Sequence, residues 1–279
     1  MGNPTRSSIL CPNCRRLISR DEPFCPHCGF RNPGTWSHLN GWIQRIRRPE
    51  DLLKVLIFVN GGMFLLSLLF NPSLGAFSSN PFSFLSPDNR SLLLLGATGT
   101  IPIDRLHRWW TLFSASYLHA GLLHIVFNMI ALRQIGPLIL YEFGIPRMFV
   151  LYSLSGVGGF WLSYLAGVPL TLGASAAVCG LIGAALYFGK SRGGSYGQMV
   201  YGQIGGWAIG IFIFGFLVPG INNWAHGGGL VSGVGLAYLL GYRERKPETP
   251  LHQLLALACA AATVAALGWA VVTALTILF

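Results

Sequence analysis

Acidic side chains are scarce in this sequence. The 279 residues include nine Asp and Glu against 19 Lys and Arg, and charged residues make up 10% of the chain while hydrophobic residues make up 52%. Because a soluble globular domain carries about a quarter charged residues, this composition excludes an ordinary water-soluble enzyme. No Asp or Glu is expected inside a long apolar segment, which disfavours a transporter that couples ions through carboxylates in the membrane. The sequence therefore predicts a polytopic membrane protein.

A secretory signal is also lacking. The first 50 residues are polar and contain no apolar stretch of the kind found in a cleavable signal peptide. Residues 71–110 are expected to form a long outer loop, because Ser, Pro, Asn and Gly are frequent there. The apolar segments predict seven membrane helices over about 52–70, 116–138, 146–166, 173–188, 199–218, 224–241 and 251–278.

The distribution of basic residues predicts the orientation. With a cytoplasmic N-terminus, 16 of the 19 basic residues fall on the inner side, and only Arg90, Arg105 and Arg108 fall outside. Since Lys and Arg favour cytoplasmic loops, we expect an integral protein of a bacterial plasma membrane, with its N-terminus in the cytoplasm and its C-terminus outside. The same distribution accounts for the net charge of +10, so no nucleic-acid partner is expected.

Four of the six cysteines lie near the N-terminus in two CxxC pairs, Cys11 with Cys14 and Cys25 with Cys28. Two such pairs can place four thiolates around one tetrahedral Zn²⁺, and Gly29 allows the tight turn after the second pair. Reduced thiols in a metal site also agree with a cytoplasmic location.

Segment 1–34 therefore resembles a zinc ribbon that holds a structural zinc ion, and a basic linker over 35–51 follows it. The ribbon has two interpretations. It is either a small metal-stapled unit without a partner, or a docking module, for which we expect a cytoplasmic protein partner.

A few polar side chains interrupt the apolar helices. The predicted topology puts His119, Ser175 and His226 near the outer ends of three helices, with His124 and Asn128 deeper on one face. Ser175 alone fits either a hydroxyl bonded back to a carbonyl one turn earlier or a nucleophile in a dry site. Because imidazole and amide groups are costly in lipid, we expect all five to face the bundle interior, and their matched depth favours the nucleophile.

Small residues recur every four positions in two of these helices. Such stripes let helix backbones approach closely, and close approach of these two would bring Ser175 to His226. The stripes consist of Ser175, Cys179 and Gly183 beside Ala176, Gly180 and Ala184 on one helix, and of Gly229, Gly233, Ala237 and Gly241 on the other.

At these residues the chain resembles the rhomboid family of intramembrane serine proteases, from about residue 52 to 241. The matching motifs are HAGLLHIVFN (119–128), GAS (173–175) and AHGGGLVSG (225–233), and the Arg108-Trp109 pair is similar to an element of the family's first outer loop. The motifs occur in the family's order on the expected helices.

The resemblance implies an all-α membrane protein: a rhomboid-like bundle of six helices over 52–241, with a charged turn and a seventh transmembrane helix over 242–279. It also implies an intramembrane serine endopeptidase that cuts single-pass transmembrane proteins near their outer ends. Ser175 would be the nucleophile and His226 its general base, and catalysis would need no cofactor.

The resemblance assigns the remaining motif residues to supporting roles. His124, Asn128 and the backbone N–H of Ser175 would form the oxyanion hole. His119 would order the outer end of its helix, and Gly173 would support the site.

Two positions depart from the family pattern. Ala176 stands where Gly usually follows the serine, and its extra methyl group would crowd the oxyanion approach. Cys179 stands where a Tyr usually packs against the catalytic histidine. The alternative function is therefore a catalytically inactive rhomboid-like protein that binds transmembrane segments for quality control or trafficking.

Overall fold

The computed structural model of the chain describes residues 8–11, 14, 16–30, 33–34, 49–70 and 84–278. The expected basic linker lies outside these ranges except for its last three residues, and so does much of the expected outer loop, over 71–83. The chain divides into two compact units, Met1–Leu52 and Leu53–Phe279.

The N-terminal unit contains an antiparallel hairpin of β1 (Ser8–Leu10) and β2 (Leu17–Ser19), with Ile9 opposite Ile18. Ile18 is buried beside Cys11 and Cys25 in a small apolar cluster. A core of this size is too small to stabilise an independent fold, so the unit depends on cross-links or metal at its cysteines.

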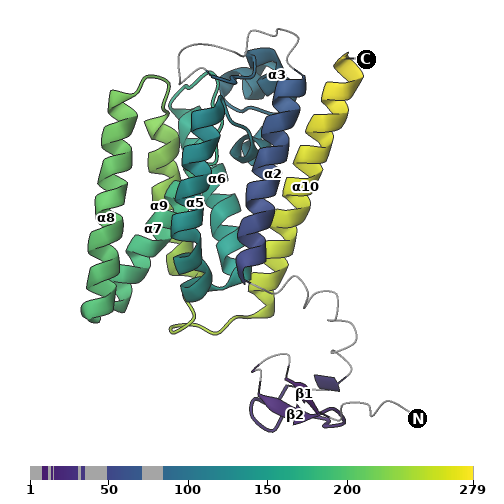
Figure 1. Cartoon of the computed structure of the whole chain (residues 1–279), viewed down its shortest axis with the longest axis vertical. Helices are drawn as coiled ribbons and strands as arrows, with labels where there is room; N and C mark the ends of the chain where they lie inside the picture. Colours follow the sequence, from purple (N-terminus) through teal and green to yellow (C-terminus); the bar gives the residue numbers. More distant parts are fainter. Residues whose placement is uncertain are drawn as a thin grey trace. The chain divides into compact units, whose positions relative to one another are not determined.

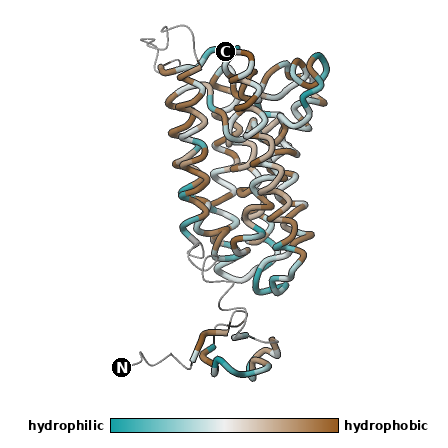
Figure 2. The backbone as a smooth tube through the Cα atoms, turned by 90° about the vertical axis from the view of Figure 1, so that its right-hand side faces the viewer, coloured by the Kyte–Doolittle hydropathy of each residue, from teal (hydrophilic) through white to brown (hydrophobic). Residues whose placement is uncertain are grey.

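The second unit is a bundle of long helices. Hydrophobic residues cover the helices between more polar ends (Figure 2). This confirms the expected all-α membrane architecture. The long helices are α2 (Pro49–Leu69), α5 (Leu122–Phe143), α6 (Ile145–Leu165), α7 (Ser175–Arg192), α8 (Gly194–Leu217), α9 (Asn223–Leu240) and α10 (Pro250–Leu278) (Figure 1).

The seven helices are of two kinds. By length and composition, α2, α5, α6, α8 and α10 can cross a membrane. Helices α7 and α9 have 18 residues each, are rich in Gly and Ala, and do not reach the hydropathy expected of a membrane span. Most of α7 is buried, and both helices pack closely with α6 and with each other. Helix α7 thus lies mostly among neighbouring helices, whereas α9 buries one face and exposes Trp224, Val231, Tyr238 and Leu239 on another.

Glycines allow α7 and α9 to touch along their backbones. A Cβ atom on Gly229 would overlap the carbonyl oxygen of Ala176, and a Cβ atom on Gly233 would overlap that of Gly180. This contact confirms the close approach predicted from the small-residue stripes.

The segment before α5 is more ordered than the expected loop. It contains α3 (Asn89–Leu94), a π-helix (Ile101–Arg105), α4 (Thr111–Ser114) and a 3₁₀ turn (Ala115–Tyr117). Trp109 of this segment packs against Trp161 and Tyr164 of α6, with ring centroids 5.8 and 5.5 Å away. Aromatic rings at this end of the bundle suit a membrane interface.

The helix expected from residue 116 begins only at Leu122, so the prediction that His119 lies on it is wrong. The backbone is extended at Leu118, directly after the 3₁₀ turn, and again at Gly121, the N-cap of α5. Two extended residues so close together prevent a continuous helix. His119 therefore lies in the short loop that leads into α5.

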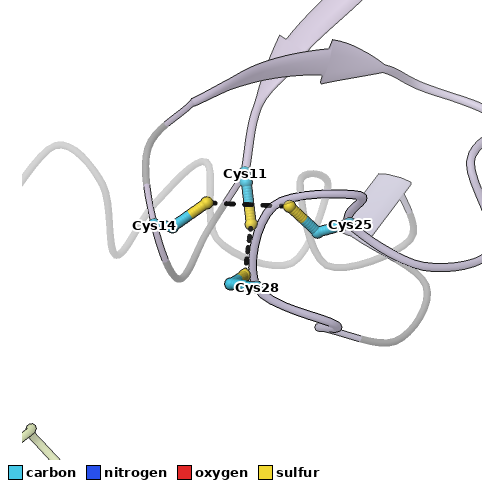
Figure 3. A group of neighbouring side chains, drawn as sticks. All are labelled: Cys11, Cys14, Cys25 and Cys28. Carbon is cyan, nitrogen blue, oxygen red and sulfur yellow. Dashed lines mark hydrogen bonds between the residues drawn. The ribbon is translucent and has the colours of Figure 1, made fainter.

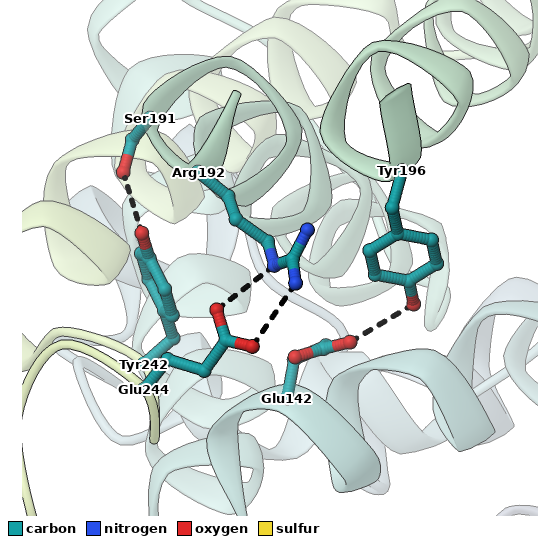
Figure 4. Close-up of polar contacts among 6 residues, drawn as sticks. All are labelled: Glu142, Ser191, Arg192, Tyr196, Tyr242 and Glu244. Atoms are coloured by element: carbon teal, nitrogen blue, oxygen red, sulfur yellow. Dashed lines mark hydrogen bonds and ion pairs between the residues drawn. The ribbon is translucent and has the colours of Figure 1, made fainter. Parts of the chain in front are cut away.

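At its other end α5 continues through Pro137 to Phe143, which places Glu142 in the last helical turn. The expectation that no acidic residue lies in a membrane helix is thus wrong here. Glu142 is 4% exposed, and the Tyr196 hydroxyl donates a hydrogen bond to its carboxylate at 2.9 Å (Figure 4). The hydrogen bond from Tyr196 offsets part of the cost of burying the carboxylate.

Side chains also connect the C-terminal end of α7 to the segment between α9 and α10. Arg192 donates two hydrogen bonds to Glu244, at 2.8 and 3.1 Å (Figure 4). Those bonds lower the pKa of the Glu244 carboxyl. The Ser191 hydroxyl also donates to the Tyr242 hydroxyl at 3.3 Å. These contacts lie at the opposite end of α7 from Ser175, so they fix the helix where no chemistry is expected.

Candidate functional site

The four N-terminal cysteines converge on one point (Figure 3). Their sulfur atoms all lie within 4.8 Å of one another, and the closest pairs are Cys11 with Cys28 at 3.7 Å and Cys14 with Cys25 at 3.6 Å. Two thiolates on a tetrahedral zinc ion lie about 3.8 Å apart, given zinc–sulfur bonds of about 2.3 Å. A disulfide would bring the sulfurs to about 2 Å. The four residues therefore fit a metal ion and not a pair of disulfides.

The two knuckles have the same backbone geometry. Cys11 N–H donates to the carbonyl of Arg16, and Cys25 N–H donates to the carbonyl of Phe30, both at 2.9 Å and both five residues along the chain. Gly29 has a φ of +71°, a conformation that favours glycine. The turn expected at this glycine is thus present.

Ser175 is the first residue of α7 and so lies at one end of the helix bundle. The segment before it is held by an antiparallel bridge between Thr98 and Thr171 and by a hydrogen bond from Gly173 N–H to the Ala115 carbonyl at 2.9 Å. Among the described residues, the Ser175 hydroxyl makes no hydrogen bond, so the alternative of a hydroxyl bonded back to a carbonyl is not realised. The hydroxyl is free to react with a bound group.

His124 lies at the start of α5 with a defined proton position. Its Nδ1 accepts a hydrogen bond from the backbone N–H of Ala120 at 3.3 Å. A neutral imidazole that accepts at Nδ1 carries its proton on Nε2. The Nε2 atom is therefore a hydrogen-bond donor.

This donor and the Ser175 hydroxyl meet at Gly173. A Cβ atom on Gly173 would lie 2.7 Å from His124 Nε2 and 3.6 Å from Ser175 Oγ. Gly173 also has a φ of +126°, which other residues rarely adopt. The missing side chain therefore lets the His124 ring pack against the backbone of Gly173, with the Ser175 hydroxyl close to the same point.

Asn128 and His119 flank His124. Asn128 is 6% exposed, and its Nδ2 donates one hydrogen bond to the His124 carbonyl at 2.9 Å. His119 is fully buried and meets the His124 ring edge-on, with centroids 5.0 Å apart. Neither ring nitrogen of His119 has a hydrogen-bond partner among the residues that the structure describes. His119 thus contacts His124 by packing, although it lies off the helix.

His226 lies in the first turn of α9 and is 7% exposed. Its Nδ1 has no hydrogen-bond partner in the described part of the chain, and no hydrogen bond joins it to Ser175. The contact between Gly229 and Ala176 brings the two helices together close to both residues, because Gly229 follows His226 by three residues and Ala176 follows Ser175 directly.

Ala176 and Cys179 are both buried. Ala176 belongs to an apolar cluster that includes Phe160 and Ala225. A Cβ atom on Gly159 of α6 would lie 2.9 Å from the Ala176 methyl group, so the absence of a side chain on Gly159 makes room for that methyl group. No aromatic ring packs on His226 within the described ranges.

Asn222 was not singled out from the sequence, although it is the N-cap of α9. Its Oδ1 accepts from the backbone N–H groups of Trp224 at 3.1 Å and Ala225 at 3.2 Å. An Asn directly before an apolar helical run is a signal for such a cap, which could have found it.

Together these residues offer the parts of acyl-transfer chemistry: a hydroxyl without a partner in the described part of the chain, a buried imidazole and an N–H donor close to the hydroxyl. The reaction that fits the site best is therefore attack of a hydroxyl on a carbonyl.

The chain has relatives of known name. The family model of the Rhomboid domain matches residues 106–243. RHOMBOID-like protein 1 of Arabidopsis thaliana is 32% identical over 68% of this chain and 52% of its own length. Rhomboid protease GluP of Bacillus subtilis is 35% identical over 56% of this chain and 31% of its own length. Inactive RHOMBOID-like protein 8 of Arabidopsis thaliana is 30% identical over 64% of this chain and 51% of its own length.

The matches thus span about half of the plant relatives' length and less of the bacterial protease. The matched residues 106–243 include every motif of the site, from His119 to Gly233. Through this domain, the chain belongs to the rhomboid family.

Proposed function

We propose that this protein is an intramembrane serine endopeptidase that cuts transmembrane segments of other proteins near their outer ends. The observation that carries the proposal is the meeting of His124 Nε2 and Ser175 Oγ at Gly173. A substrate carbonyl group bound next to Ser175 would have a nucleophile and a hydrogen-bond donor within reach.

In the first half of the proposed reaction, Ser175 Oγ forms a bond to the scissile carbonyl carbon and its proton passes to His226. The negative oxygen of the tetrahedral intermediate accepts hydrogen bonds from His124 Nε2–H and from the second N–H of the Asn128 amide. His226 then gives its proton to the leaving nitrogen as the C–N bond breaks. A water molecule hydrolyses the acyl-enzyme by the same steps and frees Ser175.

The N-terminus of α7 would also stabilise the negative charge on the oxygen of the tetrahedral intermediate. The first N–H groups of a helix have no partner within the helix, and they carry a partial positive charge. Ser175 is the first residue of α7, so its backbone N–H is a further donor for the oxyanion. Each such donor contributes about 10²- to 10³-fold in rate in soluble serine proteases.

The substrate must be at least partly unwound before cleavage. Carbonyl groups inside a helix are already hydrogen-bonded, so they cannot enter the site until the helix opens. Preferred substrates are single-pass membrane proteins with helix-weakening Gly or Pro in the transmembrane segment and a small residue at the cut. Replacing those residues by Leu or Ala should slow cleavage. An unchanged rate would show that unwinding does not limit the reaction.

One observation favours the alternative of an inactive rhomboid-like protein that binds transmembrane segments. Ser175 and His226 are not hydrogen-bonded to each other, and no ring among the described residues holds His226 in place. A relative with the word inactive in its name is 30% identical to this chain. Binding without cleavage would use the same bundle and leave Ser175 unreactive.

Labelling with a serine-reactive fluorophosphonate distinguishes the two functions. Native protein should be labelled at Ser175 and should cut a model transmembrane substrate, whereas Ser175→Ala should do neither. His226→Ala should be nearly as damaging, because a serine hydroxyl is a weak nucleophile without its base, and the two losses should not add. Cleavage at the native site by pure Ser175→Ala protein would refute the mechanism.

The orientation and the domain boundaries belong to the same proposal. The ribbon over 1–34 and the linker over 35–51 lie in the cytoplasm, and the core over 52–241 is followed by a last helix within 242–279. A reporter fused after Phe279 should then be found outside the cytoplasm. A cytoplasmic signal from that reporter would remove the last membrane crossing.

A further inference from the structure

The side chain of Asn222 makes hydrogen bonds to two backbone N–H groups and to two hydroxyl groups. Its Oδ1 caps α9 by accepting two backbone N–H groups, as described above. Its Nδ2 donates to the hydroxyl oxygen of Ser163 at 2.6 Å and to that of Thr171 at 2.9 Å. All four hydrogen-bonding positions of the amide are therefore occupied.

The two hydroxyls belong to different parts of the site's framework. Ser163 is fully buried near the end of α6. Thr171 lies in the segment before Ser175, where it exchanges two backbone hydrogen bonds with Thr98, at 2.7 and 3.0 Å. The amide of Asn222 thus joins the start of α9 both to α6 and to the segment that leads into α7.

The positions of these residues along the chain give the bridge a consequence for chemistry. Thr171 precedes Ser175 by four residues, and Asn222 precedes His226 by four residues. The Asn222 carbonyl also accepts the backbone N–H of His226 at 3.2 Å. Since no hydrogen bond joins Ser175 to His226 directly, their relative position depends on the segments that carry them.

We infer that Asn222 is a positioning residue for the reaction, because its bridge to Thr171 and Ser163 holds the His226 end of α9 in register with the Ser175 segment. The inference rests on the proposed proteolytic function. Capping α9 needs only the Oδ1 atom, so the bridge made by Nδ2 is a separate feature that can be removed on its own.

Two variants separate the cap from the bridge. Asn222→Ser keeps a good N-cap but is too short to reach Thr171 and Ser163. Asn222→Asp keeps the cap and the length, and the two hydroxyls can rotate to donate to its carboxylate. Thr171→Val removes one arm of the bridge without changing the shape of the side chain.

The experiment uses the full chain in detergent with a model transmembrane substrate. Asn222→Ser should lower kcat by about 10- to 100-fold, the effect of misplacing reacting groups by about 1 Å. KM should stay within about twofold of the native value, since the substrate contacts remain. Asn222→Asp should restore most of the rate, and Thr171→Val should lie between. The double variant Asn222→Ser with Thr171→Val should be no slower than Asn222→Ser, because both act on one bridge.

Hydrogen exchange provides a readout that does not need cleavage. In Asn222→Ser, amides of residues 168–174 should exchange faster, while those of 223–226 should change little because the cap remains. Native rates and native exchange in Asn222→Ser would overturn the inference, and so would a loss of kcat that Asn222→Asp shares. If native protein never cleaves substrate, the proposed function fails, and the exchange experiment still decides whether Asn222 holds the two segments together.

Discussion

At the scale of single residues, Gly173 is the position where a small change should have the largest effect on chemistry. Gly173→Ala adds a Cβ atom 2.7 Å from His124 Nε2 at a residue with a φ of +126°. We expect kcat on a model transmembrane substrate to fall by about 10²-fold, because the donor must move away from the oxyanion. Gly167→Ala is the matched control, since Gly167 also has a positive φ of +77° but open space around it. Equal rates for the two variants would contradict the geometry.

His124 and Asn128 should differ in importance. His124→Ala removes the donor that faces Ser175, whereas Asn128→Ala removes an amide that already spends one N–H on the His124 carbonyl. We expect His124→Ala to lower kcat more than Asn128→Ala, with KM nearly unchanged in both, because oxyanion contacts act in the transition state. Steady-state kinetics on one substrate measures both constants. A larger loss in Asn128→Ala would show that Asn128, and not His124, is the main donor to the oxyanion.

The sequence carried much of the information about this site, but not all of it. The motifs around Ser175 and His226 predict residues that the structure brings to one end of the bundle. The sequence could not predict which ring nitrogen of His124 carries the proton, because this depends on a hydrogen bond from the backbone N–H of Ala120 in a loop. The role of Asn222 was also out of reach, since its partners Ser163 and Thr171 are more than 50 residues away along the chain.

At the scale of the helices, the contact between α7 and α9 predicts a sharp difference between two glycines of one helix. A Cβ atom on Gly229 would overlap the Ala176 carbonyl, while one on Gly235 would meet nothing within 4 Å. Gly229→Ala should therefore lower the free energy of unfolding by about 1–3 kcal/mol or more, as overpacking does in well-packed cores. Gly235→Ala should be neutral or slightly stabilising, because Ala favours helix. Thermal unfolding in detergent measures both, and equal midpoints would refute the close contact.

Helix positions were predictable from apolar runs, and their ends were not. The start of α5 moved from about 116 to Leu122 because the backbone is extended at Leu118 and Gly121. Its end moved to Phe143, directly before Gly144, whose φ of +89° ends the helix. Local backbone conformation therefore sets both ends of α5, while the apolar pattern predicts that the helix exists.

At the scale of the whole chain, the cysteine cluster and the proposed proteolytic site should be separable. Purified protein should hold about one zinc ion, as four cysteine ligands in tetrahedral arrangement require. Cys11→Ser together with Cys25→Ser should abolish zinc binding, as elemental analysis of the protein would measure. Cleavage of a model substrate should be largely unchanged, because every residue proposed for the chemistry lies in the second unit, within 119–226. Loss of cleavage along with zinc would show that the ribbon controls the membrane unit.

The low apolarity of α7 and α9 has a consequence for how the protein is made. The machinery that inserts membrane proteins admits a segment according to its hydrophobicity, and the five more apolar helices meet that requirement on their own. Helices α7 and α9 instead need neighbouring helices to pack against. The segments that carry Ser175 and His226 should therefore reach their final positions only after those neighbours have entered the bilayer. A chain still on the ribosome would then lack the complete proposed proteolytic site and could not cleave newly made membrane proteins beside it. Nascent chains that end just after α7 should leave Cys179 open to thiol reagents from the aqueous side, whereas the finished protein should shield it.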